Sequence, residues 1–382
     1  METRSMMKRR LLPKSATGIL PEITTEILAR LPIRYVFQCR CVCQSWCTII
    51  DDYSFAKVHF SVAMKPTNAC TSFLICSYEE RQKFYFAEET NGDLVIKGEL
   101  RLGIPHNYLS LKDMCNGLCL LYSDDLDIYY ICNPVTTKYV EIPAIKHEPE
   151  NIGMGFSVSG QEFKVVHIFG CEAHIFTLGT DVGWRILKTI PYELEHYSCY
   201  FNGSLHWLKR KSSSVTNSKT SMIRIMSLNL DSEEFGEVPS PEIGINFGHE
   251  NRQREYYQLG VLGGYLVLTY FTNQACIDLW FMNDYNVKAS WTKQYTVVTK
   301  YPSYCYWLDD VTPICFREDG EIIIKRGGGY LTYNPESGAF TRLEIVGLRN
   351  YQSIVVFPFL GNLILPTMKY AMFEKSSCNC ST

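Results

Sequence analysis

The sequence predicts a mainly β protein that begins with a short helical unit, and two observations support this fold class. Apolar residues have a helical spacing over residues 18–60, and from residue 70 onward the spacing changes to the alternation of β-strands. After residue 60 no helical stripe extends beyond two turns, whereas short runs rich in Val, Ile, Tyr and Phe recur between turn residues. With 382 residues, 46% of them apolar, the chain can bury a large core.

Prolines divide the helical segment. Leu20-Pro21 and Leu31-Pro32 mark boundaries, because a residue before proline is disfavoured in the α region while proline suits a first helical turn. Two helical faces follow from the spacing: Ile23, Ile27, Leu28 and Leu31 on one, and Val42, Trp46, Ile49, Ile50 and Tyr53 on another. A unit of roughly forty residues is only marginally stable alone, so it predicts a partner or a larger neighbour.

Glycines recur just ahead of strands, at intervals of 41 to 61 residues: Gly117, Gly160, Gly203, Gly264, Gly320 and Gly361. Repeats of about 40–50 residues with four short strands each are typical of a β-propeller. Inserted loops around residues 209–220 and 285–312 explain the longer intervals. Residues 351–366 are expected to pair with strands in 70–100, since closing a ring removes exposed edges. The prediction is therefore a β-propeller-like domain of about six blades, with tandem sandwich domains as the alternative.

The 16 cysteines do not predict disulfides or zinc. Residues 1–13 lack the apolar stretch of a signal peptide, and no cysteine or histidine pairs have the spacing of zinc ligands. We therefore expect reduced thiols, a location in the cytoplasm or nucleus, and no metal or cofactor. A net charge of −3 argues against a nucleic-acid partner, and no apolar run is long enough for a membrane helix.

Three features could suggest an enzyme. Residues 155–160 resemble a nucleophile elbow around Ser157, but the second glycine is one residue late and a strand follows. Residues 327–329 form a glycine run that lacks the Lys-Ser/Thr ending of a phosphate loop, and predict a hairpin turn. Carboxylates cluster in turns at Asp124, Asp125, Asp127, Glu233 and Glu234. We expect no catalysis, and a propeller glycoside hydrolase remains the least favoured alternative.

Several motifs carry a resemblance to a known family. The first set is Ile19-Leu20-Pro21-Glu22-Ile23, Ile27-Leu28-Ala29-Arg30-Leu31-Pro32, Arg40-Cys41-Val42-Cys43-Gln44-Ser45-Trp46, Ser54-Phe55 and His59. Its order and spacing resemble the F-box. The second set is Cys115-Asn116-Gly117-Leu118, Asn133-Pro134, Leu279-Trp280-Phe281-Met282 and residues 285–293. It resembles the F-box-associated domain of plant F-box proteins.

The resemblance implies a three-helix F-box at residues 18–60 and a propeller-like, kelch-like interaction domain at residues 61–370. A flexible basic tail at 1–17 and a second flexible tail at 371–382 flank them. It also implies a non-catalytic substrate receptor of an SCF (Skp–cullin–F-box) ubiquitin ligase. The partners would be a Skp-type adaptor, through it a cullin and a RING subunit, and a target protein that the sequence does not identify.

Candidate site residues follow by position. The adaptor-binding residues would be Leu20, Pro21, Ile23, Ile27, Leu28, Leu31, Pro32, Val42 and Trp46. Two inserted segments are candidates for target binding: the basic Lys209, Arg210 and Lys211, and the aromatic Tyr301, Tyr304, Tyr306 and Trp307. The alternative for the basic segment is a flexible surface loop. The alternative for the aromatic segment is a packed bridge between blades. Tyr35 stands where relatives usually carry a serine, which leaves open a degenerate F-box that works outside a ligase.

Overall fold

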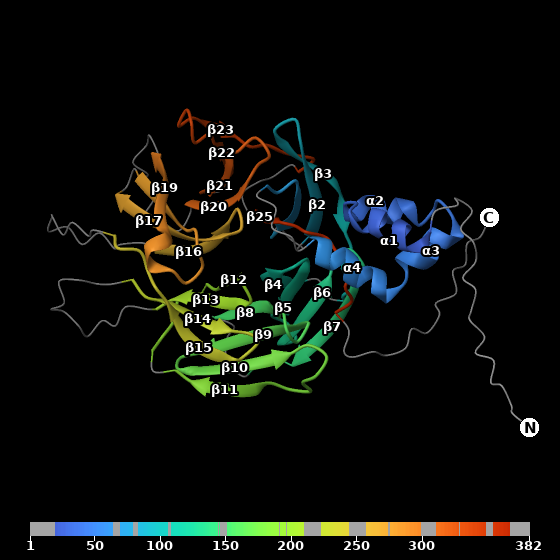
Figure 1. The fold of residues 1–382 in the computed structure, drawn as a ribbon, viewed down its shortest axis with the longest axis horizontal. Coiled ribbons are helices and arrows are strands. Elements are labelled where there is room, and N and C mark those ends of the chain that lie inside the picture. The colour runs from blue at the N-terminus through green and yellow to red at the C-terminus, as the bar shows by residue number, and fades with distance from the viewer. Residues whose placement is uncertain are drawn as a thin grey trace, which may run out of the picture. The chain divides into compact units, whose positions relative to one another are not determined.

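The computed structural model describes residues 20–366 except for 64–68, 79–82, 106–107, 144, 146–150, 191, 196, 210–222, 244–256, 274–275, 299–310, 328 and 349–353. These residues form two compact units (Figure 1). One is helical and consists of residues 20–63 together with Gly361–Ile364, and the other is a β unit built from residues 69–360. The two expected tails lie outside the described residues.

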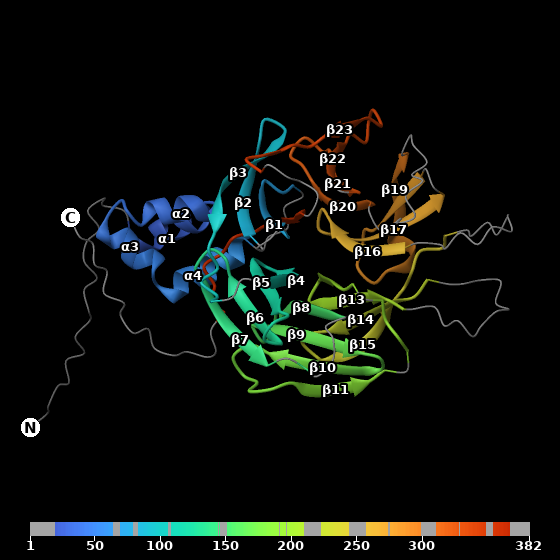
Figure 2. The same ribbon diagram turned by 180° about the vertical axis from the view of Figure 1, so that it is seen from behind.

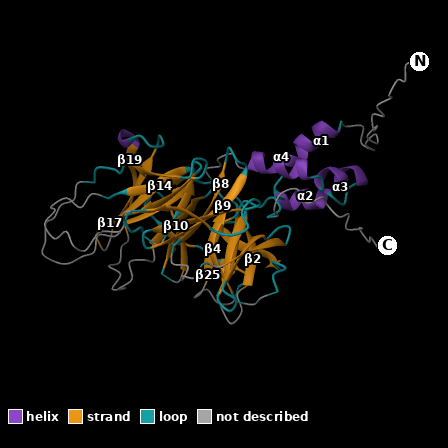
Figure 3. Ribbon diagram, turned by 90° about the horizontal axis from the view of Figure 1, so that it is seen from below, coloured by secondary structure: helices purple, strands orange, loops and turns teal. Residues whose placement is uncertain are grey.

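Four helices form the helical unit: α1 (Pro21–Ala29), α2 (Ile33–Cys39), α3 (Gln44–Ile50) and α4 (Tyr53–Ala63). Pro21 occupies the first turn of α1 after an extended Leu20, and Pro32 likewise precedes α2 in an extended conformation. Both prolines therefore act as the sequence predicts. Coloured by secondary structure, the helices are confined to this unit except for the short 3₁₀ helix η1 (Lys288–Ser290) (Figure 3).

The expectation of three helices is corrected to four. The stretch that contains Trp46 and Tyr53 breaks at Asp51-Asp52, where Asp52 caps α4 by accepting a hydrogen bond from the Ser54 amide at 2.7 Å. Asp51 also pairs with Arg40 at the end of α2, at 2.8 Å and 2.9 Å. Two aspartates with separate partners thus divide what the apolar spacing alone indicates as one continuous helix.

Six sheets make up the described β unit, so the predicted propeller of about six blades is confirmed (Figures 1 and 2). The second blade contains β4 (Leu109–Cys115), β5 (Leu118–Ser123), β6 (Ile128–Asn133) and β7 (Lys138–Pro143), and the third contains β8 (Ile152–Ser157), β9 (Glu162–Phe169), β10 (Glu172–Thr177) and β11 (Arg185–Thr189). The fourth contains β12 (Cys199–Phe201), β13 (Ser204–Leu208), β14 (Ile225–Asn229) and β15 (Glu234–Val238), and the fifth contains β16 (Tyr257–Leu262), β17 (Tyr265–Asn273), β18 (Cys276–Met282) and β19 (Trp291–Val298). The sixth contains β20 (Val311–Phe316), β21 (Ile322–Arg326), β22 (Gly329–Tyr333) and β23 (Phe340–Arg342).

The first blade closes the ring with strands from both ends of the β unit. β1 (Ser72–Ser77), β2 (Lys83–Thr90) and β3 (Asp93–Leu100) form three of its strands, and β25 (Ile354–Pro358) pairs antiparallel with β1. The short β24 (Ile345–Val346) adds a parallel strand beside β3. The hydroxyl of Tyr330, in the sixth blade, accepts a hydrogen bond from the Val356 amide at 2.9 Å. The predicted closure by residues 351–366 is therefore confirmed for residues 354–358.

The recurring glycines mark one defined turn. Gly117, Gly160, Gly203, Gly264 and Gly320 lie in the turn between the first and second strands of five blades. At Asn116-Gly117 both residues have positive φ, 48° and 81°, as a two-residue hairpin of type I′ requires. Gly361 is the exception and corrects the prediction: the first blade takes its innermost strand from the chain end, so it has no such hairpin, and Gly361 lies in the helical unit.

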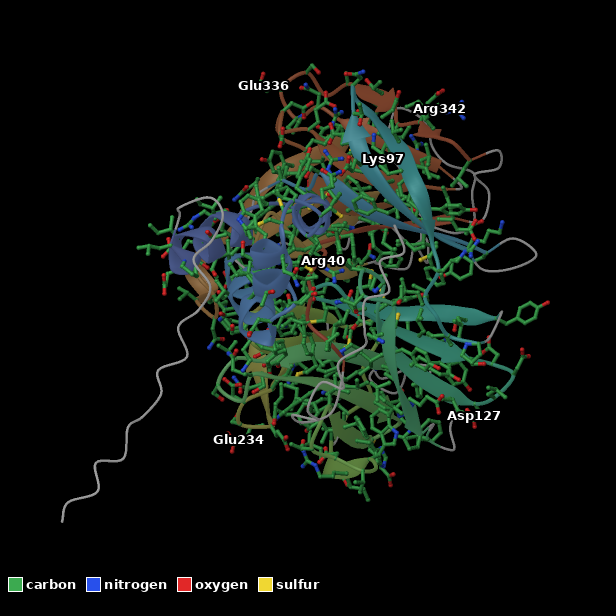
Figure 4. All side chains as sticks on the ribbon, turned by 90° about the vertical axis from the view of Figure 1, so that its right-hand side faces the viewer. Arg40, Lys97, Asp127, Glu234, Glu336 and Arg342 are labelled. Carbon is green, nitrogen blue, oxygen red and sulfur yellow. The ribbon has the colours of Figure 1, made fainter. Side chains whose placement is uncertain are left out.

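The alternation of strands separates two faces of the propeller unit. Within a blade, the turn between the first and second strands and the turn between the third and fourth strands lie on one face. The turn between the second and third strands and the connections between blades lie on the other face. The three longest connections, residues 209–224, 239–256 and 299–310, all leave on the second face, which we call the long-connection face. Figure 4 shows Asp127 and Arg342, from this face, opposite to Glu234 and Glu336. The expected insertion at 285–312 is shorter than predicted, because β19 occupies residues 291–298.

Adjacent inner strands pack closely in this ring. Asp113 of β4 accepts a hydrogen bond from the Met154 amide of β8 at 2.7 Å. On the other side of β8, a Cβ at Gly155 would lie 2.7 Å from the Tyr200 ring and would also overlap Leu230. The absence of a side chain at Gly155 therefore allows β8 and the fourth blade to approach each other.

We predict that Gly155→Ala destabilises the propeller, because the added methyl group overpacks this contact. The expected loss is about 1–3 kcal/mol in the free energy of unfolding, measured by denaturant titration of the full chain. Gly260→Ala is the matched control, since Gly260 lies on the inner strand β16 and a Cβ there meets no atom within 4 Å. Equal effects of the two substitutions would contradict this account of the contact.

Candidate functional site

Helix α1 carries apolar side chains on two of its sides. Leu20, just before the helix, and Ile23 and Ile27 within it are 63%, 50% and 49% exposed. Their spacing of three and four residues places them on one side, which we call the exposed α1 face. Thr24 and Leu28 point the other way and are buried, with the Leu28 side chain in the core of the unit. The helix therefore packs against its own unit through one side and exposes apolar side chains to solvent on the other.

The core behind this face is small. Its buried apolar members are Leu28, Ala29, Val36, Ile50, Phe55, Ala56 and Leu363. Leu31, Trp46 and several other half-buried side chains pack around them. A core of this size leaves large apolar side chains exposed, and exposed apolar groups of this kind mark interaction surfaces.

The nine residues expected to bind an adaptor fall into two groups in this structure. Leu20, Ile23, Ile27, Pro32 and Val42 are exposed, and Pro21 is half-buried. Leu28 is completely buried, and Leu31 and Trp46 pack half-buried against the core. The first group can touch a partner directly. The second shapes the surface from below, and sequence spacing could not separate the two because all of them are apolar and helical.

Tyr35, where the sequence departs from the F-box pattern, lies at the surface of α2. The Arg34 guanidinium lies 4.3 Å from the centre of the Tyr35 ring and donates a hydrogen bond to its hydroxyl. This cation–π contact holds the ring at its place on the surface. Tyr35 therefore changes the exposed surface of α2 and does not enter the core of the unit.

His59 connects α4 to the end of the α1–α2 turn. Its ring is 3% exposed, and Nε2 lies 3.1 Å from the carbonyl oxygen of Leu31, the residue before Pro32. Burial lowers the pKa of His59, because the charged imidazolium would lose its hydration. The ring is therefore neutral at pH 7, and its Nε2–H donates to the Leu31 carbonyl.

We predict that acid opens the helical unit through His59. In the unfolded chain the pKa is near 6.5, and in the folded unit it is lower. The contribution of neutral His59 to the stability of the helical unit is thus complete above pH 6.5. This contribution is lost as the pH falls below that value, because the unfolded state then binds more protons than the folded state. Hydrogen exchange of the α1–α4 amides, corrected for intrinsic rates, should show a smaller opening free energy at pH 5.5 than at pH 7.5.

His59→Gln is the control for this prediction. A glutamine Nε2 can still donate to Leu31 but does not titrate in this range, so its opening free energy should change less with pH. An identical pH dependence in both proteins would show that His59 is not the responsible group.

In the propeller unit, the expected target-binding residues are only partly described. Lys209 is half-buried, with its Nζ 5.0 Å from the centre of the Tyr192 ring. Arg210, Lys211, Tyr301, Tyr304, Tyr306 and Trp307 lie outside the described residues. The described strands that flank these segments, β13 and β14 for the first and β19 and β20 for the second, have their joined ends on the long-connection face.

Exposed aromatic side chains on the described propeller strands and turns gather on that face. Tyr78, Tyr108, Phe169 and Tyr197 lie there, and only Tyr265 lies on the opposite face. Tyr108 and Tyr197 each precede an innermost strand, β4 and β12, so they stand near the rim of the central channel. Sequence reasoning missed them, because a single tyrosine in a connection forms no motif and its exposure depends on the ring.

The features that could suggest catalysis have structural partners. Ser157 lies in β8 and donates a hydrogen bond to Asp231 at 2.5 Å, and the strand β9 follows where an elbow needs a helix. Glu233 pairs with Lys164 and Arg185, at 2.8 Å and 2.9 Å, and these partners lower its pKa. The strands β21 and β22 pair antiparallel, with Arg326 opposite Gly329, as the predicted hairpin requires.

Among the residues that the structure describes, no group of three or more His, Cys, Asp or Glu side chains is arranged to hold a metal ion. The described helices are also too short or too polar to cross a bilayer.

Residues 62–364 match the F-box associated beta propeller domain, and residues 19–57 match the F-box domain. The chain therefore belongs to the plant F-box proteins that carry an F-box associated β-propeller domain. The Arabidopsis thaliana F-box protein At3g07870 is 29% identical to it over 88% of this chain and 90% of the relative. The F-box/kelch-repeat protein At3g23880 and the F-box/LRR-repeat protein At2g43260, from the same plant, are 24% and 25% identical, over 84% and 96% of this chain and 88% and 89% of the relatives.

Proposed function

We propose that this protein is the substrate-recognition subunit of an SCF ubiquitin ligase. The F-box would dock a Skp-type adaptor, and through it a cullin and a RING subunit, while the propeller holds a target protein. The observation that carries the proposal is the exposed α1 face, which leaves three large apolar side chains in water on a unit too small to bury them. A partner helix or groove would remove them from solvent.

The mechanism is proximity, without side-chain chemistry from this chain. Holding the target and the ubiquitin-conjugating machinery in one assembly raises the effective concentration of target lysines. A closed ring suits this role because its sheets leave only short, protected edges. Specificity then lies in the surface of the propeller, and ligase recruitment lies in the F-box.

We also propose a reducing compartment, the cytoplasm or nucleus. Cys76, Cys119, Cys132 and Cys315 are free thiols and are buried among apolar side chains. Burial raises the pKa of Cys76, so this thiol stays protonated and unreactive. Cysteine serves here as a small apolar core residue.

We predict that Ile23→Ala and Ile27→Ala together weaken adaptor binding by at least about tenfold. Each truncation removes apolar surface that the complex would bury, at roughly 1–2 kcal/mol per side chain. Calorimetry with a purified Skp-type adaptor measures the affinity. Because both side chains are exposed, the thermal unfolding of the free chain should be unchanged.

Val58→Ala is the matched control, since Val58 is an exposed aliphatic residue of α4, away from α1 in sequence. Its adaptor affinity should equal that of the wild type. Wild-type affinity in the Ile23/Ile27 variant would assign the adaptor to another surface. No binding by the wild type would favour a module that works outside a ligase.

For the target we propose the long-connection face, on the strength of its exposed aromatic side chains and its long connections. Tyr108→Ala with Tyr197→Ala should remove a specific set of proteins from proximity labelling in cells treated with a proteasome inhibitor. The same proteins should accumulate when residues 1–60 are deleted, since they are then held but not degraded. Tyrosines are favoured anchors in protein interfaces.

Tyr265→Ala on the opposite face is the control and should leave the labelled set intact. Loss of the set only in this control would place the target on the face of the short turns. A labelled set that survives all three substitutions would remove these aromatic residues from the binding surface.

A further inference from the structure

The core of the F-box unit contains residues from the far end of the chain. Gly361–Ile364 belong to the helical unit, although they follow the strand β25 that closes the propeller. Leu363 is 9% exposed and lies in one cluster with Leu28, Val36 and Phe55, and Ile364 packs against that cluster. The F-box motif of residues 19–57 therefore does not supply the whole core.

The backbone around Leu363 is fixed by its neighbour. Asn362 is completely buried, and its side-chain oxygen accepts a hydrogen bond from the Ile364 amide at 2.8 Å. An asparagine that bonds the backbone two residues on makes a local turn. This turn sets the direction of the Leu363 side chain into the helical core.

The residues just before this segment belong to the β unit. Phe359 is 5% exposed and packs in a cluster of propeller side chains, and Leu360, three residues before Leu363, is 43% exposed. The contribution to the helical core therefore begins after Leu360. The helices alone also form a unit of only 43 residues up to Ala63, counted from Pro21, in which each core side chain is a large share of the total.

Leu363 also bears on the surface of α1. Leu28, in the same cluster, lies on the inner side of α1, and the exposed α1 face lies on its outer side. A core that lacks Leu363 leaves the inner side of α1 with a cavity, and cavities in small cores are poorly tolerated. The outer side then loses the rigid support that a docking surface needs.

We propose that the F-box of this protein is a composite fold, completed by Asn362–Ile364, and that its adaptor surface is competent only after the chain end has docked. Because these residues come after β25, which ends at Pro358, a chain that has not been made beyond the closing strand has no complete F-box. Ligase recruitment is thereby restricted to receptors that extend through residue 364. The consequence for the adaptor rests on the proposed function, whereas the composite core does not.

The test compares Leu363→Ala with the matched Leu360→Ala in the full chain, by hydrogen exchange and by adaptor calorimetry. We expect Leu363→Ala to speed exchange in α1–α4 by at least about tenfold while β1 and β25 stay within about twofold of the wild type. Adaptor affinity should fall by about tenfold or more. Leu360→Ala and the volume-conserving Leu363→Met should stay within about twofold of the wild type in both measurements.

Wild-type exchange in α1–α4 of Leu363→Ala would overturn the composite core. Faster exchange in β1 and β25 as well would also overturn it, since the segment would then stabilise the β unit. If the wild type binds no adaptor, the proposed function fails, and the exchange of α1–α4 still decides whether the core is composite. Faster exchange of the α1–α4 amides with unchanged adaptor affinity would show that adaptor binding does not depend on the composite core.

Discussion

The pairing of β1 with β25 is the constraint on which the propeller depends. Phe73 pairs with Pro358 and Ser77 pairs with Ile354 in the antiparallel register of these two strands. In sequence the two strands lie almost a whole β unit apart. Bringing such distant residues together costs chain entropy, which grows only slowly with the length of the loop. Burial of Phe73, Ile75, Ile354 and Val356 in one cluster offsets that cost. Without the pair, two strand edges would be exposed to other chains.

The candidate target-binding features share one face of the propeller unit. Because each blade alternates its strand directions, every connection between blades leaves on one face, and the longest loops and most exposed aromatic residues follow it there. Gly361–Ile364, which follow β25 after Phe359 and Leu360, belong to the helical unit, and Leu363 lies in its core. The proposed target-binding face and the proposed composite core therefore both belong to a chain that is closed by this strand pair.

Much of this architecture could be predicted from sequence, since it depends on local rules. Prolines at residues 21 and 32 mark helix starts, and glycines such as Gly117 and Gly320 mark hairpins, because each turn imposes its own backbone requirement. The sequence-based expectations fail where contacts beyond the local sequence pattern determine the structure. Gly361 has the spacing of the repeat but lies in another unit, since the first blade has no hairpin there. Asp52 caps α4 through a side-chain hydrogen bond that apolar spacing does not reveal.

The candidate surfaces were predictable to a smaller extent. Apolar spacing finds α1 but cannot tell Ile27, which faces water, from its neighbour Leu28, which is buried. That distinction depends on the packing of four helices and of Leu363, more than 300 residues away in sequence. Tyr108 and Tyr197 were not predictable for a similar reason, since only the closed ring brings connections of different blades to one face.

The most direct test of this account is the stoichiometry and affinity of the full chain with a purified Skp-type adaptor, measured by calorimetry and light scattering. We expect one adaptor per chain, with a dissociation constant of about 1 µM or below, which corresponds to roughly 8 kcal/mol. Binding should also show a negative change in heat capacity, because the exposed α1 face is apolar. No complex at adaptor concentrations of about 100 µM would contradict the central claim that this fold recruits a ligase through its F-box.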